Sequence, residues 1–266
     1  RQKYRHIGHV LWTYEWEAQY RNLMMSYSNG PRASPTVDGD RVYVFGAAGM
    51  MLCLMADTGE VVWAIDAVQA YDTTVPVFGI SSSPLVDGDQ VIYVVGGEPD
   101  ALVVAFDKMT GVEVWRAISV VSEMGYAQPM IIEAGGVRQL IIFHPTAVTS
   151  LSPDTGEIYW DQPFDVTGGL TISTPVRSGN SLFLTSFYSG SMMLRLNNDR
   201  PTASLLWKRV GGSELPEGTD SLHSIITTPI VEGDYIYGVD SYGELRGLDA
   251  RTGDRLWTSD AMTTQA

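Results

Sequence analysis

The chain has 266 residues, of which 44% are hydrophobic and 18% charged, so it holds enough apolar side chains for a large globular core. Asp and Glu total 31 against 17 Lys and Arg, a formal charge of −14, and such a surface repels phosphate backbones and anionic lipid. Nucleic acid is therefore not an expected partner, and no run reaches the roughly 18 apolar residues that a transmembrane helix needs.

Five segments along the chain begin in the same way. Each has a polar residue, a proline, a short apolar run, a turn and then a strand rich in β-branched and aromatic residues. The prolines lie at positions 35, 84, 129, 175 and 229, so the repeat length is 45 to 54 residues. A repeat of this length predicts a solenoid or a propeller.

Turn residues divide each repeat into short strands. Asp38-Gly39 and Asp87-Gly88 stand between apolar runs, which is a strong signal for a β-hairpin, and Ser178-Gly179 and Glu232-Gly233 occupy the same place. No long window shows the 3.6-residue period of an amphipathic helix, so helices should be nearly absent. Four short strands in every repeat predict an all-β fold, a β-propeller of four-stranded antiparallel blades.

Six tryptophans mark the ends of the repeats. Their spacing is 45 to 52 residues, and four of them close a Thr-Gly-x-x-x-Trp pattern. An indole is large and stiff and has one N–H donor, so it can wedge between two blades and bond a backbone carbonyl. We therefore assign a structural, blade-docking role to these residues: Trp12, Trp63, Trp115, Trp160, Trp207 and Trp257.

The two registers of proline and tryptophan predict five blades, near residues 33–66, 80–119, 126–164, 170–210 and 224–260. The fourth of these has no Thr-Gly before its tryptophan and carries Pro201 in the turn, so we expect a longer, irregular turn before an intact last strand.

An orphan outer strand is expected near residues 9–17, ending a blade whose other strands lie outside the sequence. Only nine residues follow Trp257, too few for further strands, so we expect one incomplete propeller domain over residues 1–266 that forms an open arc. Trp257 should then be less buried than Trp115.

The pattern that starts at Ala105 and ends at Trp115, Ala-x-Asp-x-x-Thr-Gly-x-x-x-Trp, resembles the tryptophan-docking element of the PQQ-like, or quinoprotein-like, propeller repeat. That repeat builds quinoprotein alcohol dehydrogenases, the periplasmic lipoprotein of the bacterial β-barrel assembly machine and PQQ-binding-like repeat proteins of planctomycete-type bacteria. The resemblance implies a bacterial, periplasmic or otherwise extracytoplasmic protein. It also implies that the chain is part of an eight-bladed ring, whose missing blades would be its first partners.

Catalytic and metal-binding patterns are weak. The quinoprotein enzymes place a pair of adjacent cysteines beneath a calcium-bound quinone, whereas this sequence has only Cys53, which we interpret as a buried, inert thiol. His6 and His9 are the only histidines close in sequence, and Asp220, Ser221 and His223 are too near one another to indicate a triad. We therefore expect no catalytic residues, no metal and no cofactor.

Two connections between blades are unusually long, residues 66–79 and 211–224, and long loops on a rigid scaffold are common binding sites. Candidate contacts for a ligand at the mouth of the central channel are Arg32, Tyr126 and His223, although hydrogen bonding within the channel is the favoured role for all three.

The favoured function is a non-enzymatic, extracytoplasmic scaffold that presents a loop face to a protein or a small ligand. The alternative is a PQQ-dependent oxidoreductase whose catalytic residues lie outside this sequence.

Overall fold

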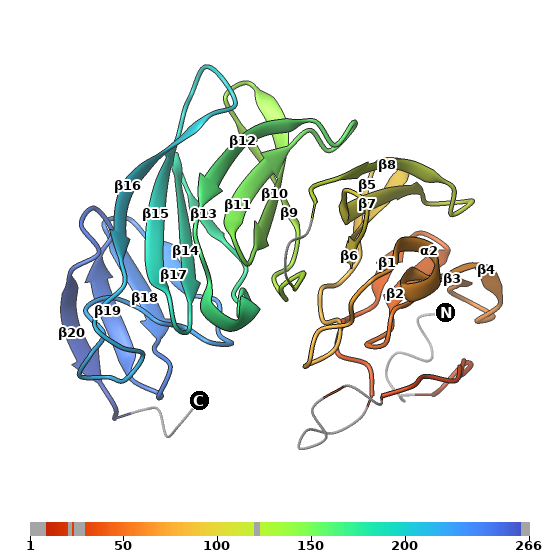
Figure 1. Ribbon diagram of the computed structural model, residues 1–266, viewed down its shortest axis with the longest axis horizontal. Coiled ribbons are helices and arrows are strands. Elements are labelled where there is room, and N and C mark those ends of the chain that lie inside the picture. Colours follow the sequence, from red (N-terminus) through yellow and green to blue (C-terminus); the bar gives the residue numbers. More distant parts are fainter. Residues whose placement is uncertain (1–8, 21–22, 24–29, 120–122, 262–266) are drawn as a thin grey trace. The chain divides into compact units, whose positions relative to one another are not determined.

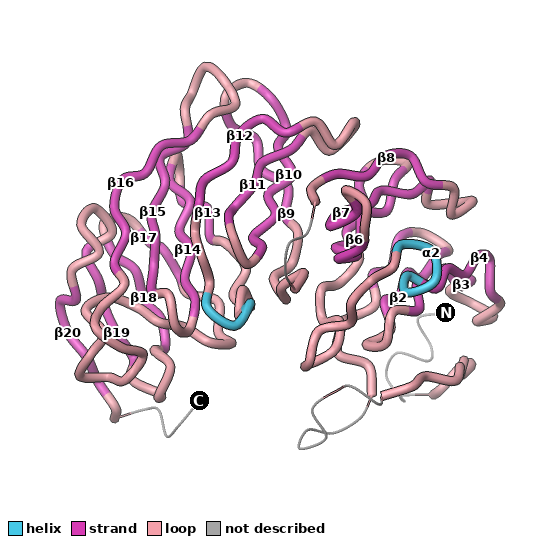
Figure 2. The backbone as a smooth tube through the Cα atoms, in the orientation of Figure 1, coloured by secondary structure: helices cyan, strands magenta, loops and turns pink. Residues whose placement is uncertain are grey.

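A computed structural model of the chain describes residues 9–20, 23, 30–119 and 123–261 (Figure 1). Strands and loops make up nearly all of this part, and only α2 (Ala67–Tyr71) and the 3-10 turn η1 (Thr167–Gly169) are helical (Figure 2). The strands form five separate four-stranded sheets. The prediction of an all-β fold built from four-stranded antiparallel blades is therefore confirmed.

The chain divides into two compact units, Arg1–Val120 and Val121–Ala266, and each is described by itself. The first unit holds blades one and two. Blade one consists of β1 (Thr36–Asp38), β2 (Arg41–Phe45), β3 (Met50–Met55) and β4 (Val61–Asp66). Blade two consists of β5 (Leu85–Asp87), β6 (Gln90–Gly97), β7 (Ala101–Asp107) and β8 (Glu113–Ala117).

The second unit holds blades three, four and five. Blade three consists of β9 (Met130–Ala134), β10 (Val137–His144), β11 (Ala147–Leu151) and β12 (Ile158–Pro163). Blade four consists of β13 (Val176–Ser178), β14 (Ser181–Ser186), β15 (Gly190–Leu196) and β16 (Ala203–Arg209). Blade five consists of β17 (Ile230–Glu232), β18 (Tyr235–Val239), β19 (Leu245–Asp249) and β20 (Arg255–Ser259).

All five blades lie within the residue ranges that the repeat predicts. Within each blade the strands follow one another in chain order, and every neighbouring pair is antiparallel. The first strands of neighbouring blades lie beside each other, β1 with β5 and β13 with β17. The single domain over residues 1–266 and the open arc stay predictions.

Glycines make the hairpin turn between the first and second strands. Asp38 pairs with Arg41 and Asp87 with Gln90, so each turn has two residues and begins with a glycine. Gly39 and Gly88 take φ values of 57° and 56°, a region that disfavours residues with a Cβ atom. The turn signal in the sequence is therefore correct, with glycine as the first of the two turn residues.

A β-bulge recurs in front of the tryptophan of every blade. Cys53 pairs with Trp63 and Leu54 with Val61, which leaves Val62 as the extra residue. The same shift of register occurs between the third and fourth strands of the other four blades. Because a bulge re-aims the residue beside it, the bulge sets the direction in which each indole leaves its sheet.

The irregular turn expected in blade four is present. Asn197 N donates to the carbonyl of Thr202 at 2.9 Å, and Thr202 N donates to Arg200 at 2.8 Å, so the turn closes around Pro201. β16 follows it and pairs with β15 on both sides of the bulge. Loss of the Thr-Gly pair therefore changes the turn and leaves the last strand intact.

Residues 9–20 lie against blade one without any strand pairing. Two indoles hold this segment in place. A Cβ atom added to Gly59 would lie 2.6 Å from the ring of Trp12, and one added to Gly46 would lie 2.9 Å from the ring of Trp16. The expected orphan strand is thus held by side-chain packing on glycines and forms no ladder of hydrogen bonds.

No helix in the described ranges combines the length and the apolar character needed to cross a bilayer.

Candidate functional site

The tryptophan of blade one contacts blade two in a defined geometry. The indole nitrogen of Trp63 donates to the carbonyl of Lys108 at 3.1 Å. A Cβ atom added to Gly111 would lie 2.9 Å from the same ring, so the Thr-Gly turn of blade two forms a flat seat for the indole. Glycine is required there both for this close approach and for a φ of 72°.

Trp12 and Trp207 repeat this geometry at two other blades. Their indole nitrogens donate to the carbonyls of Ala56 at 3.1 Å and of Ala250 at 2.9 Å. Each of these carbonyls belongs to the residue two positions before the threonine of a Thr-Gly pair, as Lys108 does. The repeat therefore encodes both the seat and the acceptor of the indole.

Trp115 and Trp160 use a different acceptor. Their indole nitrogens donate to the side-chain oxygens of Gln90, at 2.9 Å, and of Gln139, at 2.8 Å, within their own blades. Both glutamines lie on the second strand of their blade. Gln90 stands two residues before the residue that pairs with Ala105, and Gln139 stands two residues before the residue that pairs with Ser150. Ala105 and Ser150 are the small residues opposite the tryptophans. A polar side chain at this position thus takes the N–H that other blades donate to a backbone carbonyl.

Trp257 is the exposed member of the series. Its side chain is 42% exposed, whereas Trp115 is 7% exposed, the difference that the sequence predicted. One face lies on Gly247, where an added Cβ atom would come within 2.3 Å of the ring, and Tyr237 lies 6.3 Å away between ring centroids.

Arg32 belongs to the first unit, while Tyr126 and His223 belong to the second. The guanidinium of Arg32 passes close to Gly79, where an added Cβ atom would lie 3.0 Å from Nε. That Nε atom is buried, and it has no hydrogen-bond partner among the described residues.

Tyr126 is 5% exposed and lies at the junction of blades three and four. Its backbone nitrogen donates to the carbonyl of Thr171 at 3.0 Å, and its hydroxyl donates to Glu123 at 3.4 Å. These contacts join two neighbouring connections and leave little of the ring accessible.

His223 is fully buried between blades four and five. Its Nδ1 lies 2.8 Å from the carbonyl of Phe187, and its backbone nitrogen donates to Asp240 at 2.6 Å. Because a carbonyl can only accept, Nδ1 carries a proton, while the buried Nε2 has no hydrogen-bond partner among the described residues. His223 is therefore an internal support for the turn that holds Phe187.

A buried ion cluster, for which no pattern in the sequence is a signal, lies next to His223. Arg246 and Asp240 are both fully buried, with Nη1 and Oδ1 separated by 3.0 Å, and Arg246 also contacts Glu244 at 2.5 Å. Burial raises the pKa of Asp240, and this effect outweighs the hydrogen bond from His223 and the charge of Arg246.

Arg246 also fixes the long connection at residues 211–224. It donates to the carbonyls of Pro216 at 3.2 Å and of Ser221 at 2.9 Å, and it bonds the hydroxyl of Thr219. Within the connection, Gly212 N donates to Gly218 at 2.7 Å. This connection, predicted as a long binding loop, is therefore a folded loop with an arginine at its centre.

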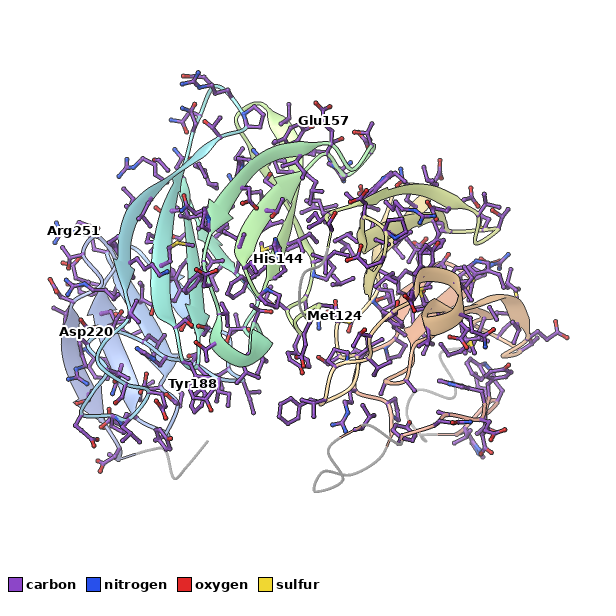
Figure 3. All side chains as sticks on the ribbon, in the orientation of Figure 1. Met124, His144, Glu157, Tyr188, Asp220 and Arg251 are labelled. Carbon is purple, nitrogen blue, oxygen red and sulfur yellow. The ribbon has the colours of Figure 1, made fainter. Side chains whose placement is uncertain are left out.

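Three aromatic side chains gather at the turns beside this loop. Phe187 and Tyr188 come from the turn between β14 and β15, and Tyr242 comes from the turn between β18 and β19. Ring centroids lie 4.4 Å apart for Phe187 and Tyr188 and 6.2 Å apart for Phe187 and Tyr242. Tyr188 and Tyr242 are 39% and 45% exposed. We call Phe187, Tyr188 and Tyr242 the aromatic patch, of which Figure 3 labels Tyr188.

The other long connection, residues 66–79, contains the helix α2. Asp66 caps the helix by accepting from Val68 N at 3.0 Å and from Gln69 N at 3.3 Å. The helix ends at Asp72, which takes a left-handed φ of 52°. Five residues are too few to show a helical period, so the N-cap was the only signal in the sequence.

A polar chain in blade three was also missed. His144 Nε2 lies 2.8 Å from the hydroxyl of Thr149, and that hydroxyl donates to Asp161 at 2.5 Å. Burial lowers the pKa of His144, so this histidine is neutral at physiological pH. The chain of bonds ties β10 to β11 and β12 and includes no nucleophile beside the imidazole other than the threonine hydroxyls.

The absence of a quinone site with calcium stays a prediction. Cys53 is fully buried in β3, and the described residues hold no group of three or more His, Cys, Asp or Glu side chains that could bind a metal ion. The Asp220, Ser221 and His223 run forms no triad either. His223 Nδ1 faces the carbonyl of Phe187, while Asp220 lies 3.8 Å from Arg209. His6 lies outside the described residues.

Comparison with known proteins identifies one family over most of the chain. Residues 5–259 match a family model described as outer membrane protein assembly factor BamB. The outer membrane protein assembly factor BamB of Yersinia pestis is 24% identical over 84% of this chain and 55% of its own length. The quinoprotein ethanol dehydrogenase of Pseudomonas aeruginosa is 26% identical over 51% of this chain and 23% of its own.

Solved structures agree on the fold. The crystal structure of BamB from Moraxella catarrhalis is 17% identical in sequence, with a TM-score of 0.62 over 87% of this chain and 62% of that one. The chain thus spans a little more than half the length of the assembly-factor relatives that it matches.

Proposed function

Because the chain belongs to the PQQ-like repeat family described as outer membrane protein assembly factor BamB, we propose that it is a non-enzymatic propeller scaffold that binds a partner protein through its loop face. Relatives that match most of the chain are named outer membrane protein assembly factors, which supports a role in assembly over a catalytic one.

The loop face of the second unit carries this proposal. There Tyr188 and Tyr242 are exposed, while the polar groups beneath them are buried: His223 contacts Phe187 and Asp240, and Arg246 contacts Asp240. Exposed aromatic side chains on a rigid support are typical of protein-binding surfaces. A catalytic site would instead keep acids, bases or nucleophiles accessible to a substrate.

The same family membership supports an extracytoplasmic location. The relatives are named for the assembly of outer membrane proteins, so we infer that the chain works in the periplasm.

The alternative function is PQQ-dependent oxidation. The match to a quinoprotein ethanol dehydrogenase favours it, although that match covers 23% of the enzyme. The sequence has a single cysteine, and the described residues hold no group of three or more His, Cys, Asp or Glu side chains that could bind a metal ion, so this function would rest on residues outside the 266.

The scaffold is tested in the bacterium that encodes the chain. Deleting the gene should lower the amount of folded outer membrane β-barrel protein, measured by heat-modifiable migration on gels, and a copy of the gene should restore it. Fractionation of a tagged chain should recover it with the envelope. Unchanged barrel proteins after deletion, or recovery of the tag in the cytoplasm, would refute the proposal.

A further inference from the structure

The aromatic patch spans two neighbouring blades. Phe187 and Tyr188 belong to blade four and Tyr242 to blade five, and Phe187 contacts both of the other rings. Figure 3 labels Tyr188 on the lower edge of the second unit in that view. Two tyrosines that are 39% and 45% exposed therefore flank one less exposed phenylalanine at the ends of adjacent hairpins.

Buried polar groups fix the positions of these turns. His223 bonds the carbonyl of Phe187 at 2.8 Å, and Ser224 donates to the carbonyl of Val239 at 2.7 Å, directly before the turn of blade five. Both residues lie on the segment between blades four and five. A surface that is held in this way loses little conformational entropy when it binds, which favours affinity.

The loop at residues 211–224 continues the patch. Ser241, next to Tyr242, donates to the carbonyl of Glu214 at 3.2 Å, so the tip of the loop lies against the turn of blade five. Leu215 follows Glu214 and is 42% exposed. An aliphatic side chain thus adds to the exposed apolar surface of the aromatic patch.

The charge around the patch is mainly acidic, although Arg209 pairs with Asp220 and Arg246 pairs with Asp240 and Glu244. The segments that form it, residues 185–190, 211–224 and 240–245, contain five carboxylates and no lysine or arginine. Asp240 is buried, whereas Glu217 and Asp220 are exposed at the surface of the loop. The exposed surface is therefore aromatic and apolar with an acidic border.

We propose that this surface binds an extended segment of a partner protein in which arginine or lysine alternates with apolar residues. This proposal rests on the scaffold function and names the class of partner that the loop face takes. A guanidinium can stack on the rings of Tyr188 and Tyr242 and pair with the acidic border. The apolar residues of the segment cover Leu215 and Phe187.

Two labelled decapeptides test the chemistry, one alternating arginine with leucine and one alternating arginine with serine. Fluorescence anisotropy with the intact chain should give at least about tenfold tighter binding for the leucine peptide, because only that peptide covers the apolar surface. Equal binding of the two peptides would show attraction by net charge alone and would overturn the proposal.

Matched variants locate the binding site. The double variant Tyr188→Ser and Tyr242→Ser should weaken binding of the leucine peptide about tenfold or more. Tyr235→Ser is the control, because Tyr235 is 48% exposed on the same blade and lies outside the patch. Circular dichroism checks that each variant is folded. Equal effects of the patch variants and the control would overturn the proposal.

The outcomes separate this inference from the proposed function. If the Tyr188 and Tyr242 variant restores barrel-protein levels to a deletion strain as the parent does, the scaffold function stands and this surface is not its binding site. If deletion of the gene has no effect on barrel proteins while the peptide still binds at the patch, the proposed binding surface is supported and the proposed scaffold function is refuted.

Discussion

Cys53 illustrates how burial governs chemistry at a single residue. The thiol has no exposed surface, and burial raises its pKa to about 11, so the reactive thiolate is scarce at neutral pH. We predict that iodoacetamide at pH 8 does not modify Cys53 in the folded protein but does so fully in guanidinium chloride. Mass spectrometry measures the modification. Equal labelling under both conditions would contradict the buried, inert role.

Trp63 and Trp257 are chemically identical residues in different surroundings. Trp63 is 8% exposed and bonds Lys108, whereas Trp257 is 42% exposed. Trp63→Ala should lower the free energy of unfolding by about 3–5 kcal/mol, as truncation of buried aromatic residues does. Trp257→Ala should lower the free energy of unfolding by clearly less. Urea titration measures both, and similar losses would contradict a docking role for the indole.

The carboxyl of Asp240 should make stability depend on pH. Burial raises its pKa, so the folded protein binds this proton more tightly than the unfolded chain does. The resulting stabilisation is complete below the unfolded pKa of about 3.9 and is lost as the pH rises through the higher folded pKa.

Comparison with Asp240→Asn isolates this effect, because asparagine does not titrate. The unfolding free energy of the parent, minus that of the variant, should fall as the pH rises from about 4 and then become constant. Urea titrations across this range give the difference. A difference that increases with pH would mean that the ion pair with Arg246 outweighs burial.

At the scale of the element, the Thr-Gly turn is as important as the tryptophan that it seats. Gly111→Ala would impose a Cβ atom at a φ of 72° and place it 2.9 Å from the ring of Trp63. Gly39→Ala is the matched control, because Gly39 has a φ of 57° and no atom within 4 Å of the added carbon.

Both substitutions should lose about 1–2 kcal/mol from backbone strain, and Gly111→Ala should lose more because the indole must move. Thermal unfolding of the two variants measures the difference. Equal losses of stability in the two variants would contradict the role of Gly111 in packing against the indole of Trp63.

Strands and turns could be predicted from the sequence because each has a local cause. The residue pair Asp38-Gly39 marks a hairpin by its own backbone preference, and the period of the tryptophans survives even in blade four, where the Thr-Gly pair is lost. The helix α2 escaped because five residues show no period and only Asp66 signals its start.

The candidate site could be predicted only in part, because its contacts join distant residues. The loop at residues 211–224 can be recognised in the sequence by its length. Nothing in the sequence distinguishes Arg246 from a surface arginine, and only the fold brings it into contact with Pro216 and Ser221. The position of His223 in a long loop makes it a candidate contact, whereas in the fold it lies buried and supports Phe187. Gln90 likewise gains its role only through the register of β6 against β7.

At the scale of the whole molecule, one repeat serves both enzymes and assembly factors, so function depends on what each chain adds to the blades. This chain adds a braced loop and exposed aromatic rings, and it lacks the adjacent cysteines that the quinoprotein enzymes place beneath their cofactor. We therefore predict that it neither binds PQQ nor oxidises alcohols.

The purified chain is incubated with calcium and PQQ and then passed over a gel-filtration column. We expect the absorbance of the quinone in the small-molecule fractions and none in the protein fractions. Addition of alcohols or sugars should give no reduction of an artificial electron acceptor. A quinoprotein alcohol dehydrogenase treated in parallel is the positive control for both measurements. The physical reason for this expectation is that the described residues hold no group of three or more His, Cys, Asp or Glu side chains, and that the negative charges of the quinone meet a protein of net charge −14. Quinone that remains with the protein, or turnover that depends on it, would make the enzyme the better assignment.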